Sequence, residues 1–303
     1  MIEVEDLTKR YGRVAAVDAL SFVVRPGVVT GFLGPNGAGK STTLRLILGL
    51  AAPTHGTARI DGRAYAELPR PMREVGVLLD ADTAHAGRTA VDHLRWLARS
   101  NAISRRSVDA VLEQVGLAAV GRTRVGGFSL GMRRRLGLAA ALLGDPGVLI
   151  LDEPTNGLDP DGIRRLRDRI RALAGEGRTV FVSSHLMSEM ELTADRLIVI
   201  AEGRLIADTS VRELTDRFAR GVLVRSPRAG ELASAAVSAG ATVATEPDGR
   251  LVVRGLEPHD IGDLAATRGI PVWEIRARTA SLEEAYVELT AGRLEFVPTE
   301  PAR

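Results

Sequence analysis

The 303-residue chain has no cysteine and no long apolar run. The first absence excludes a disulfide framework and a thiolate metal site. No stretch approaches the roughly 18 apolar residues that a membrane-spanning helix needs, and the longest candidate, residues 136–144, reaches about half that length. Residues 1–6 are acidic and lack the apolar core of a secretory signal. We therefore expect any membrane role to depend on a partner.

An excess of charge of one sign is also missing. The 40 Lys and Arg residues are balanced by 38 Asp and Glu residues, which gives a formal net charge of +2, and no basic tail is present. This balance argues against a dedicated nucleic-acid-binding protein. Lysine is scarce, because only Lys9 and Lys40 occur in the whole sequence. A lysine kept in such an arginine-rich chain suggests a position at which arginine would not fit.

A glycine-rich segment lies between an apolar strand expected at residues 28–33 and a helix expected at residues 42–50. Residues 34–41 fit the phosphate-loop pattern G-x-x-x-x-G-K-[ST]. Its glycines allow backbone N–H groups to converge on phosphate oxygens, and the helix N-terminus favours the same anion. Lys40 can reach the β- and γ-phosphates of ATP, and Ser41 can hold Mg²⁺. The alternative is a glycine-rich turn without a ligand, which the flanking strand and helix disfavour. The expected ATP-binding residues are Gly34, Pro35, Asn36, Gly37, Ala38, Gly39, Lys40, Ser41 and Thr42.

Two carboxylates end a second apolar strand, expected at residues 148–151. Asp152 and Glu153 would lie where the carboxyl end of a central strand meets the nucleotide crevice. Asp152 can hold Mg²⁺, and Glu153 can orient or deprotonate the attacking water. An acidic strand end that merely faces solvent is the alternative, and it loses weight once the phosphate loop is considered.

Two further candidates stand at the ends of elements. Ser129 and Gly131 begin a helix expected at residues 133–143, where a small hydroxyl and a glycine can contact an anion, although serine is also simply a good N-cap. His185 follows a strand expected at residues 179–183, where it can contact the γ-phosphate. A lone histidine of this kind is otherwise a structural residue.

Strands alternate with helices over about the first 215 residues. This alternation predicts an α/β fold, namely a P-loop NTPase core with an N-terminal antiparallel β-subdomain and a helical subdomain inserted at about residues 83–145. A capping box at residues 89–92 would begin one of the inserted helices. Further expected strands lie at residues 2–4, 19–24, 197–200 and 205–207, and a helix is expected over about residues 163–175.

The pattern changes after residue 215. Expected strands at 222–225, 241–245, 251–254 and 272–276 and helices at 230–238 and 260–266 follow the order β-α-β-β-α-β, which is typical of a ferredoxin-like fold. A capping box at residues 281–284 would start a last helix at 282–290. We therefore divide the chain into an ATPase domain at 1–215 and a small α+β accessory domain at 216–303.

Taken in chain order, these motifs resemble the ATPase subunit of an ABC transporter. The resemblance covers about residues 1–215 and rests on the phosphate loop, Ser129 with Gly131, the two carboxylates, residues 156–159 and the pair 184–185. Residues 157–160 and the ending at 281–290 are similar to exporter ATPases of the drug-resistance and bacteriocin-immunity type. Those ATPases pair with a separate membrane permease.

The resemblance implies roles for particular residues. Tyr11 matches the aromatic residue that stacks on adenine, the alternative being an aromatic packed in a β-turn. Ser129 and Gly131 match the signature that reaches the γ-phosphate of ATP on the other subunit. Asp159 matches the loop that communicates across the dimer, and His185 matches the switch histidine.

The sequence also departs from the family pattern. The usual signature is Leu-Ser-Gly-Gly-Gln, but Phe128, Leu130 and Met132 stand at its first, third and fifth places, while the serine and second glycine are retained. Asp80 occupies the place where the family has a glutamine, which makes it a further candidate contact for Mg²⁺ or water. Residues 80–95 would face the permease.

These features together predict a Mg²⁺-dependent ATPase that works as a homodimer or heterodimer at the cytoplasmic face of the membrane, bound through a permease. No nucleic-acid partner is expected. The alternative function is an ABC-type soluble ATPase that acts on nucleic acid or the ribosome, with residues 133–135 contacting phosphates. A sensor that binds nucleotide without hydrolysing it is a third alternative, which Asp152, Glu153 and His185 disfavour.

Overall fold

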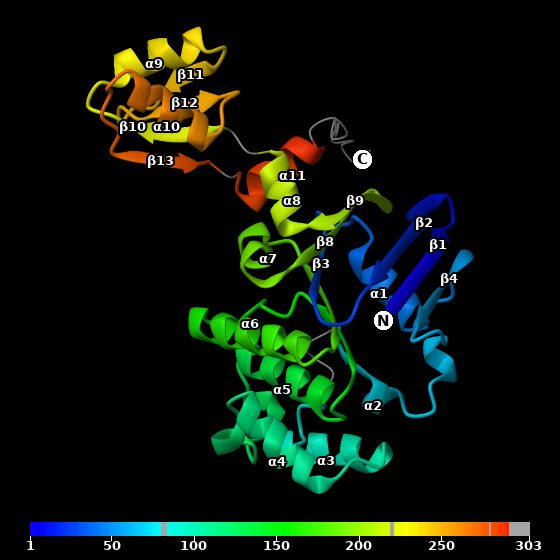
Figure 1. Cartoon of the computed structure of the whole chain (residues 1–303). Coiled ribbons are helices and arrows are strands. Elements are labelled where there is room, and N and C mark those ends of the chain that lie inside the picture. Colours follow the sequence, from blue (N-terminus) through cyan, green and yellow to red (C-terminus); the bar gives the residue numbers. More distant parts are fainter. Residues whose placement is uncertain (80–83, 219–220, 279, 291–303) are drawn as a thin grey trace, which may run out of the picture. The chain divides into compact units, whose positions relative to one another are not determined.

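The computed structural model describes residues 1–79, 84–218, 221–278 and 280–290 (Figure 1). The chain forms two compact units, Met1–Ser210 and Val211–Arg303. Each unit has its own hydrophobic core. The division falls five residues before the boundary expected at residue 215. Within the described residues, no helix combines the length and apolar character that crossing a bilayer requires.

A six-stranded sheet forms the centre of the first unit. Its order is β5-β6-β7-β3-β8-β9, in which β9 alone runs antiparallel to its neighbour. Strands β3, β6 and β7 are buried over their whole length, as expected for apolar strands of a parallel sheet covered on both faces. The strands are β3 (Val29–Leu33), β5 (Val75–Leu78), β6 (Val148–Asp152), β7 (Thr179–Ser184), β8 (Arg196–Ala201) and β9 (Arg204–Ser210).

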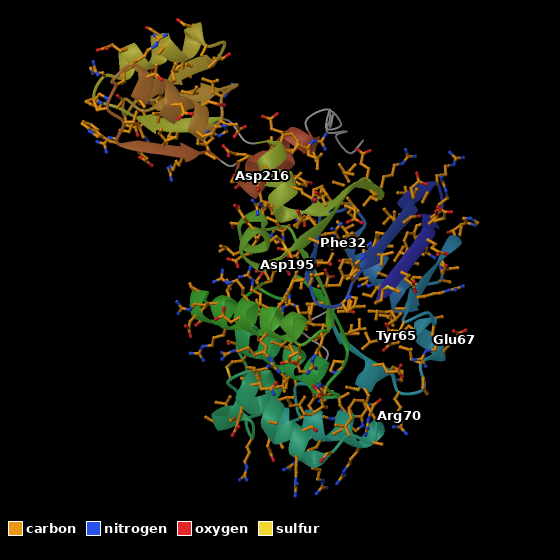
Figure 2. All side chains as sticks on the ribbon, in the orientation of Figure 1. Phe32, Tyr65, Glu67, Arg70, Asp195 and Asp216 are labelled. Carbon is orange, nitrogen blue, oxygen red and sulfur yellow. The ribbon has the colours of Figure 1, made fainter. Side chains whose placement is uncertain are left out.

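A separate antiparallel sheet, in the order β2-β1-β4, packs over one face of the central sheet. The rings of Phe22, Phe32 and Phe181 meet in the core between them, with centroids 5.1 to 5.8 Å apart. Figure 2 shows Phe32 inside this unit, together with Asp195, whose Oδ2 accepts a 2.8 Å hydrogen bond from the N–H of Val29 at the start of β3. The strands of this sheet are β1 (Ile2–Tyr11), β2 (Val14–Val24) and β4 (His55–Ile60).

Helices cover both faces of the central sheet. Helix α1 lies on the side of the antiparallel sheet, and α6 and α7 lie on the other side. Three helices, α3 to α5, pack on one another beyond β5. Half of the expected capping box is present, because the side chain of Thr89 accepts the N–H of Asp92 at the start of α3. The helices are α1 (Lys40–Ile47), α2 (Pro71–Glu74), α3 (Ala90–Ser100), α4 (Arg105–Gln114), α5 (Leu130–Leu142), α6 (Pro160–Gly175) and α7 (Met187–Thr193), and the short 3₁₀ turns are η1 (Tyr65–Glu67), η2 (Ala118–Val120) and η3 (Val125–Gly127).

The second unit contains a four-stranded antiparallel sheet in the order β11-β12-β10-β13. Helices α9 and α10 pack against its core side. At the start of α11, Ser281 and Glu284 form the expected reciprocal capping contacts. The elements are α8 (Val211–Arg217), β10 (Val222–Arg225), α9 (Ala229–Ser238), β11 (Thr242–Thr245), β12 (Leu251–Arg254), α10 (Pro258–Thr267), β13 (Glu274–Ala277) and α11 (Leu282–Thr290).

Several elements differ from the sequence-based expectation. Strands β1 and β2 are longer than expected, since register shifts interrupt the alternation on which the expectation rested. Strand β4 and the short helices α2, α7 and α8 were not expected. Strand β5 occupies residues that were assigned only to the glutamine-loop region. Helix α1 begins at Lys40, two residues before its expected start, so the lysine belongs to the first helical turn.

Candidate active site

The phosphate loop connects the end of β3 to α1. Gly37 and Gly39 adopt φ angles of 83° and 103°, which L-residues with a side chain rarely adopt. A Cβ on Gly39 would also overlap the backbone carbonyl of Ala16, so β2 passes directly against the loop. The groove at this loop is lined by Ala16, Pro35, Asn36, Gly37, Gly39, Lys40, Ser41, Thr42 and Glu153. The phosphate-loop residues predicted from sequence thus share one groove with a predicted carboxylate.

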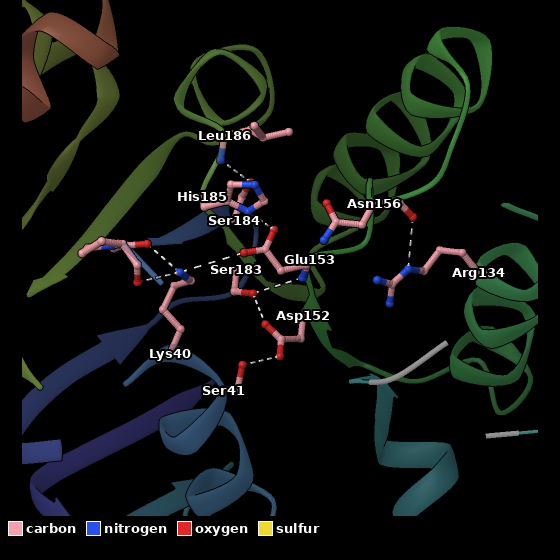
Figure 3. Close-up of polar contacts among 12 residues, drawn as sticks. Lys40, Ser41, Arg134, Asp152, Glu153, Asn156, Ser183, Ser184, His185 and Leu186 are labelled. Carbon is pink, nitrogen blue, oxygen red and sulfur yellow. Dashed lines mark hydrogen bonds and ion pairs between the residues drawn. The ribbon is translucent and has the colours of Figure 1, made fainter. Parts of the chain in front are cut away.

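Lys40 lies at the centre of this groove with only 6% of its side chain exposed. Its Nζ donates hydrogen bonds to the carbonyl oxygens of Gly34 at 2.5 Å and Pro35 at 3.2 Å, and it lies 3.9 Å from Oε1 of Glu153 (Figure 3). Burial lowers the pKa of the Lys40 ammonium, and the nearby carboxylates Glu153 and Asp152 oppose that shift. The charge is therefore held in a desolvated position beside the loop carbonyls.

Asp152 is fixed by two hydroxyl groups. Ser41 Oγ donates to its Oδ2 at 2.8 Å, and Ser183 Oγ donates a short hydrogen bond to its Oδ1. The sheet explains the second contact, because Asp152 pairs with Ser183 in the register between β6 and β7, and both side chains point to the face that carries α1. Strand β7 lies between β3 and β6, so it bridges the phosphate loop and the carboxylates.

Glu153 adopts a left-handed backbone conformation, with a φ of 48°. Its N–H donates to the backbone oxygen of Ser183 at 3.2 Å and to the Oγ of the same residue at 3.1 Å. A non-glycine residue in this region is an uncommon and mildly strained choice, of the sort found at functional sites. The turn directs the carboxylate away from Asp152 and toward the groove (Figure 3).

His185 completes the polar cluster. Its Nδ1 lies 2.8 Å from Oε2 of Glu153, so one carboxylate is placed between this imidazole and the Lys40 ammonium. The hydroxyl of Ser184 accepts the N–H of Leu186 at 2.9 Å, which shapes the turn that carries the histidine. The imidazole is partly exposed, whereas Lys40 beneath it is buried.

The remaining candidates cap helices. Ser129 caps α5 by accepting the N–H of Met132 at 3.2 Å, and Asp159 caps α6 by accepting the N–H of Gly162 at 3.1 Å. A Cβ on Gly131 would lie 2.7 Å from the carbonyl oxygen of Gly157, so the first turn of α5 packs tightly against the loop before α6. Neither helix start lines the phosphate-loop groove of the same chain.

Tyr11 lies away from the polar cluster in the groove. Tyr11 ends β1 with 55% of its side chain exposed, and Lys9 Nζ lies 5.1 Å from the centre of its ring. The contribution of the antiparallel sheet to the groove is Ala16 of β2, and Tyr11 is not among the lining residues. Asp80 lies outside the described residues.

Sequence reasoning missed Ser183, Ala16 and Gly203. The turn at Gly203 accepts the N–H of Asp18 at 2.8 Å and donates to the carbonyl of Ala38 at 3.0 Å, so it supports the phosphate loop from the side. A hydroxyl two residues before the candidate His185 was the available signal for Ser183. Ala16 and Gly203 carry no chemical signal, since their backbone positions alone matter.

The fold and the polar cluster at the groove together define the class of protein to which the chain belongs. A mostly parallel sheet bearing a phosphate loop on β3, a carboxylate pair on β6 and a histidine after β7 belongs to a P-loop ATP-binding cassette. The family model described as ABC transporter matches residues 17–156, and a domain of unknown function, DUF8746, matches residues 220–283.

Relatives extend this match over most of the chain. A Bacillus subtilis (strain 168) protein, "Uncharacterized ABC transporter ATP-binding protein YhcH", is 37% identical over 98% of both chains. "Nod factor export ATP-binding protein I" of Paraburkholderia xenovorans (strain LB400) is 44% identical over 68% of this chain and 70% of its own. A solved structure, "Structure of ATP binding subunit of ABC transporter", superposes with a TM-score of 0.66 at 29% identity over 72% of this chain and 93% of its own. The chain belongs to the ATP-binding subunits of ABC transporters, the ATPases that hydrolyse ATP to power transport.

Proposed function

We propose that this chain hydrolyses ATP at a site shared between two ATPase subunits and thereby drives an export permease. The observation that carries the proposal is the geometry around Glu153. Its carboxylate lies between the Lys40 ammonium and the His185 imidazole, at the rim of the phosphate-loop groove. The base Glu153, the phosphate-binding cation Lys40 and the imidazole of His185 thus lie together at this rim.

In the proposed reaction, the loop N–H groups and Lys40 hold the β- and γ-phosphates of ATP in the groove. Glu153 accepts a proton from a water molecule as that water attacks the γ-phosphorus. The bond from the γ-phosphorus to the bridging oxygen breaks, and its electron pair leaves with ADP. His185 keeps the carboxylate in place and contacts the γ-phosphate. Positioning and charge stabilisation supply most of the rate.

Ser41 and Asp152 fit a Mg²⁺ ion. Their oxygens lie 2.8 Å apart at the groove, and hydroxyl and carboxylate oxygens are the hard donors that Mg²⁺ prefers. Mg²⁺ takes one or two protein oxygens and completes its shell with water and substrate phosphates, so a small donor set is enough. When bound, the ion would neutralise charge on the phosphates. We keep Asp80 as a third candidate contact for Mg²⁺ or water, solely because it stands where the family has a glutamine.

A second subunit would complete the site. Ser129 and Gly131 lie outside the groove of their own chain, and both stand at a helix N-terminus, where backbone N–H groups favour an anion. We assign them to the γ-phosphate of ATP held by the opposite subunit. Asp159 is assigned to contact across the same interface, and Tyr11 to stacking on adenine from β1. The partner can be a second copy of this chain or a related subunit.

Mixing two inactive variants tests the shared site. Lys40→Ala removes the phosphate-loop cation, and Ser129→Arg blocks the signature end of α5. Each variant alone should be inactive. In an equimolar mixture, half of the dimers would contain both variants, and each of these has one intact composite site, so activity should return to about a quarter of the wild-type rate. A mixture as inactive as its components would contradict the shared site, provided that circular dichroism shows both variants folded.

The transport partner and the accessory unit are proposed on the similarity to the relatives. A separate permease would bind the ATPase at the cytoplasmic face of the membrane, and we propose export because the chain is similar to a Nod factor export ATP-binding protein. We propose an ATPase domain at 1–215 with a helical subdomain at about 83–145. The strand order β11-β12-β10-β13 supports a ferredoxin-like accessory domain at 216–303.

A tagged chain isolated from membranes tests the partner. A polytopic permease should be recovered with it. Recovery of ribosomes or nucleic acid instead would favour the alternative function, a soluble ABC-type ATPase. The relatives, which are transporter ATP-binding proteins over most of their length, do not favour that alternative.

A further inference from the structure

In the part of the second unit that the structure describes, α9 and α10 pack on one face of the sheet. Val222 and Val224 of β10 point to the core formed with α9 and α10. Side chains alternate along a strand, so Leu223 and Arg225 point to the opposite face. In the register of the sheet, Leu223 pairs with Val252 of β12 and with Arg276 of β13. These positions therefore belong to the face opposite α9 and α10.

Arginine dominates a hollow on this face. The hollow is lined by Leu223, Glu246, Arg250, Arg276, Ala277 and Arg278. Three guanidinium groups thus surround one carboxylate, that of Glu246. The lining carries a net charge of +2, although the whole 303-residue chain is almost neutral.

The arginine side chains extend across the sheet. Arg278 Nη1 lies 2.5 Å from Oε1 of Glu246, although Arg278 follows β13 at one edge and Glu246 follows β11 at the other. The two side chains together therefore span the width of the sheet, and Leu223 of β10 and Val252 of β12 on this face are almost fully buried. Charged side chains make up most of the lining of the hollow, and Leu223 and Ala277 are its apolar residues.

Glu246 cannot satisfy these cations alone. Arg250 Nη2 also approaches it, at 3.4 Å, and Arg250 Nε lies 2.6 Å from Asp248 at the neighbouring turn. Among the described residues, Arg276 forms an ion pair with the outer acid Glu274, at 3.1 Å through Nε, and its side chain is 62% exposed. Each guanidinium carries five N–H donors, so these contacts with described acids leave most donors in the hollow for a ligand or water.

We infer that this hollow binds a phosphate-bearing anion. Guanidinium groups pair with phosphate oxygens through two parallel hydrogen bonds, which a compact ammonium cannot do. Arg276 and Arg278 stand two residues apart on one face and would grip the anion from β13, while Arg250 would close the site from β12. The site uses only residues of the second unit and is separate from the ATPase groove.

Calorimetric titration of the full-length chain with inorganic pyrophosphate tests the inference. Pyrophosphate also fits the phosphate loop, so the wild-type chain should bind two equivalents. The double variant Arg276→Gln/Arg278→Gln should bind one equivalent, at the phosphate loop. Lys40→Ala should also bind one equivalent, in the arginine-lined hollow. The affinity of the arginine site should fall at least tenfold in the double variant, while its ATPase rate stays at the wild-type level.

Arg268→Gln provides the matched control. Arg268 is the C-cap of α10 and does not line the hollow, so this substitution removes the same type of charge at a different place. This variant should still bind two equivalents of pyrophosphate. A single equivalent in the wild type, lost only in Lys40→Ala, would overturn the inference and leave the ATPase assignment intact. Two equivalents that persist in the double variant would also overturn it.

Vesicles distinguish two sources of the same chemistry. Sedimentation with vesicles containing anionic phosphatidylglycerol, compared with pure phosphatidylcholine, shows whether the phosphate belongs to a lipid headgroup. Binding to the anionic vesicles that is lost in the double variant assigns a headgroup. Pyrophosphate binding with no vesicle binding assigns a free phosphate compound. Vesicle binding that the double variant retains, without an arginine-dependent pyrophosphate site, would contradict the inference.

Discussion

At the scale of single residues, the site is a chain of short polar contacts across three strands. Ser41 holds one oxygen of Asp152, Ser183 holds the other, and the next residue, Glu153, contacts His185. The contacts come from the loop after β3, the end of β6 and the end of β7. Because strand ends of a rigid parallel sheet hold these side chains, little reorganisation is needed when ATP binds.

Replacing Glu153 by glutamine should separate binding from chemistry. An amide of nearly the same shape keeps the groove intact but cannot accept the proton of the attacking water. ATP affinity should stay within about threefold, and turnover should fall by about 10²- to 10⁴-fold. A fluorescent ATP titration and a phosphate-release assay measure the two effects. Turnover equal to the wild type would remove Glu153 from its assigned role.

The sequence predicted most of these residues for a physical reason. A phosphate loop requires glycines at fixed places, and carboxylates at the end of an apolar strand are rare enough to attract notice. Ser183 could not be found in the same way, because its role depends on the register that places it opposite Asp152. Register is a property of two strands, and neither strand alone reveals it.

At the scale of elements, the start of α5 and the loop before α6 form one packed joint. Gly131 allows the backbone of the helix to approach Gly157, and Leu130 would meet any side chain placed on Gly157. Arg134 Nε lies 3.5 Å from the carbonyl oxygen of Asn156 in the same joint. Movement of α5 should therefore be transmitted to the loop that leads to Asp159.

Gly131→Ala should damage this joint. The new methyl group would lie 2.7 Å from a backbone oxygen, so the helix must shift, and we expect the free energy of unfolding to fall by about 1–3 kcal/mol. Gly127→Ala is the matched control, because a Cβ there meets nothing within 4 Å. It should change stability by about 0.5 kcal/mol or less. Urea denaturation of both variants measures the difference, and equal stabilities would show that the joint is not tight.

Helix α3 carries a buried histidine that should make stability depend on pH. Burial, and secondarily the Arg88 charge, lower the pKa of His93 below its ordinary value near 6.5. Between about pH 6.5 and the lowered value, the unfolded chain binds a proton that the folded chain does not. The free energy of unfolding should therefore fall as the pH drops through this window and stay unaffected above it.

Chemical denaturation across this pH range tests the histidine. His93→Phe should lose this component of the pH dependence, whereas His259→Gln, at an exposed position, should keep it. The phenylalanine suits the site because Nδ1 of His93 is buried and has no hydrogen-bond partner among the described residues. Identical pH profiles for the wild type and His93→Phe would contradict the prediction.

The strands that differ from the sequence-based expectation do so for two physical reasons. Strand β4 contains Gly56 and Arg59 and few apolar residues, so its pairing with β1 rather than its own pattern fixes it. The long strands β1 and β2 contain bulges, which break the two-residue alternation. By contrast, β3, β6 and β7 are continuous apolar runs, and their positions were predicted within one residue.

At the scale of the whole molecule, the two units carry separate chemistry. The unit Met1–Ser210 holds the cluster around Lys40 and Glu153, and the unit Val211–Arg303 holds the arginine-lined hollow. Each has its own core, as independent domains do. The proposed shared site makes ATP turnover a property of the dimer, so energy release is tied to subunit closure and can be passed to a permease.

The scarcity of lysine supplies the most direct test of the central claim, that Lys40 acts as a compact charge between ATP phosphates. Lys40→Arg keeps the charge but places a wider, planar group in a pocket that leaves only 6% of the side chain exposed. Lys9→Arg is the matched control, because Lys9 lies on β1, and arginine can keep its contact with the Tyr11 ring. We predict that the steady-state ATPase rate falls at least 100-fold in Lys40→Arg and stays near the wild-type value in Lys9→Arg. A wild-type rate in folded Lys40→Arg would contradict the account.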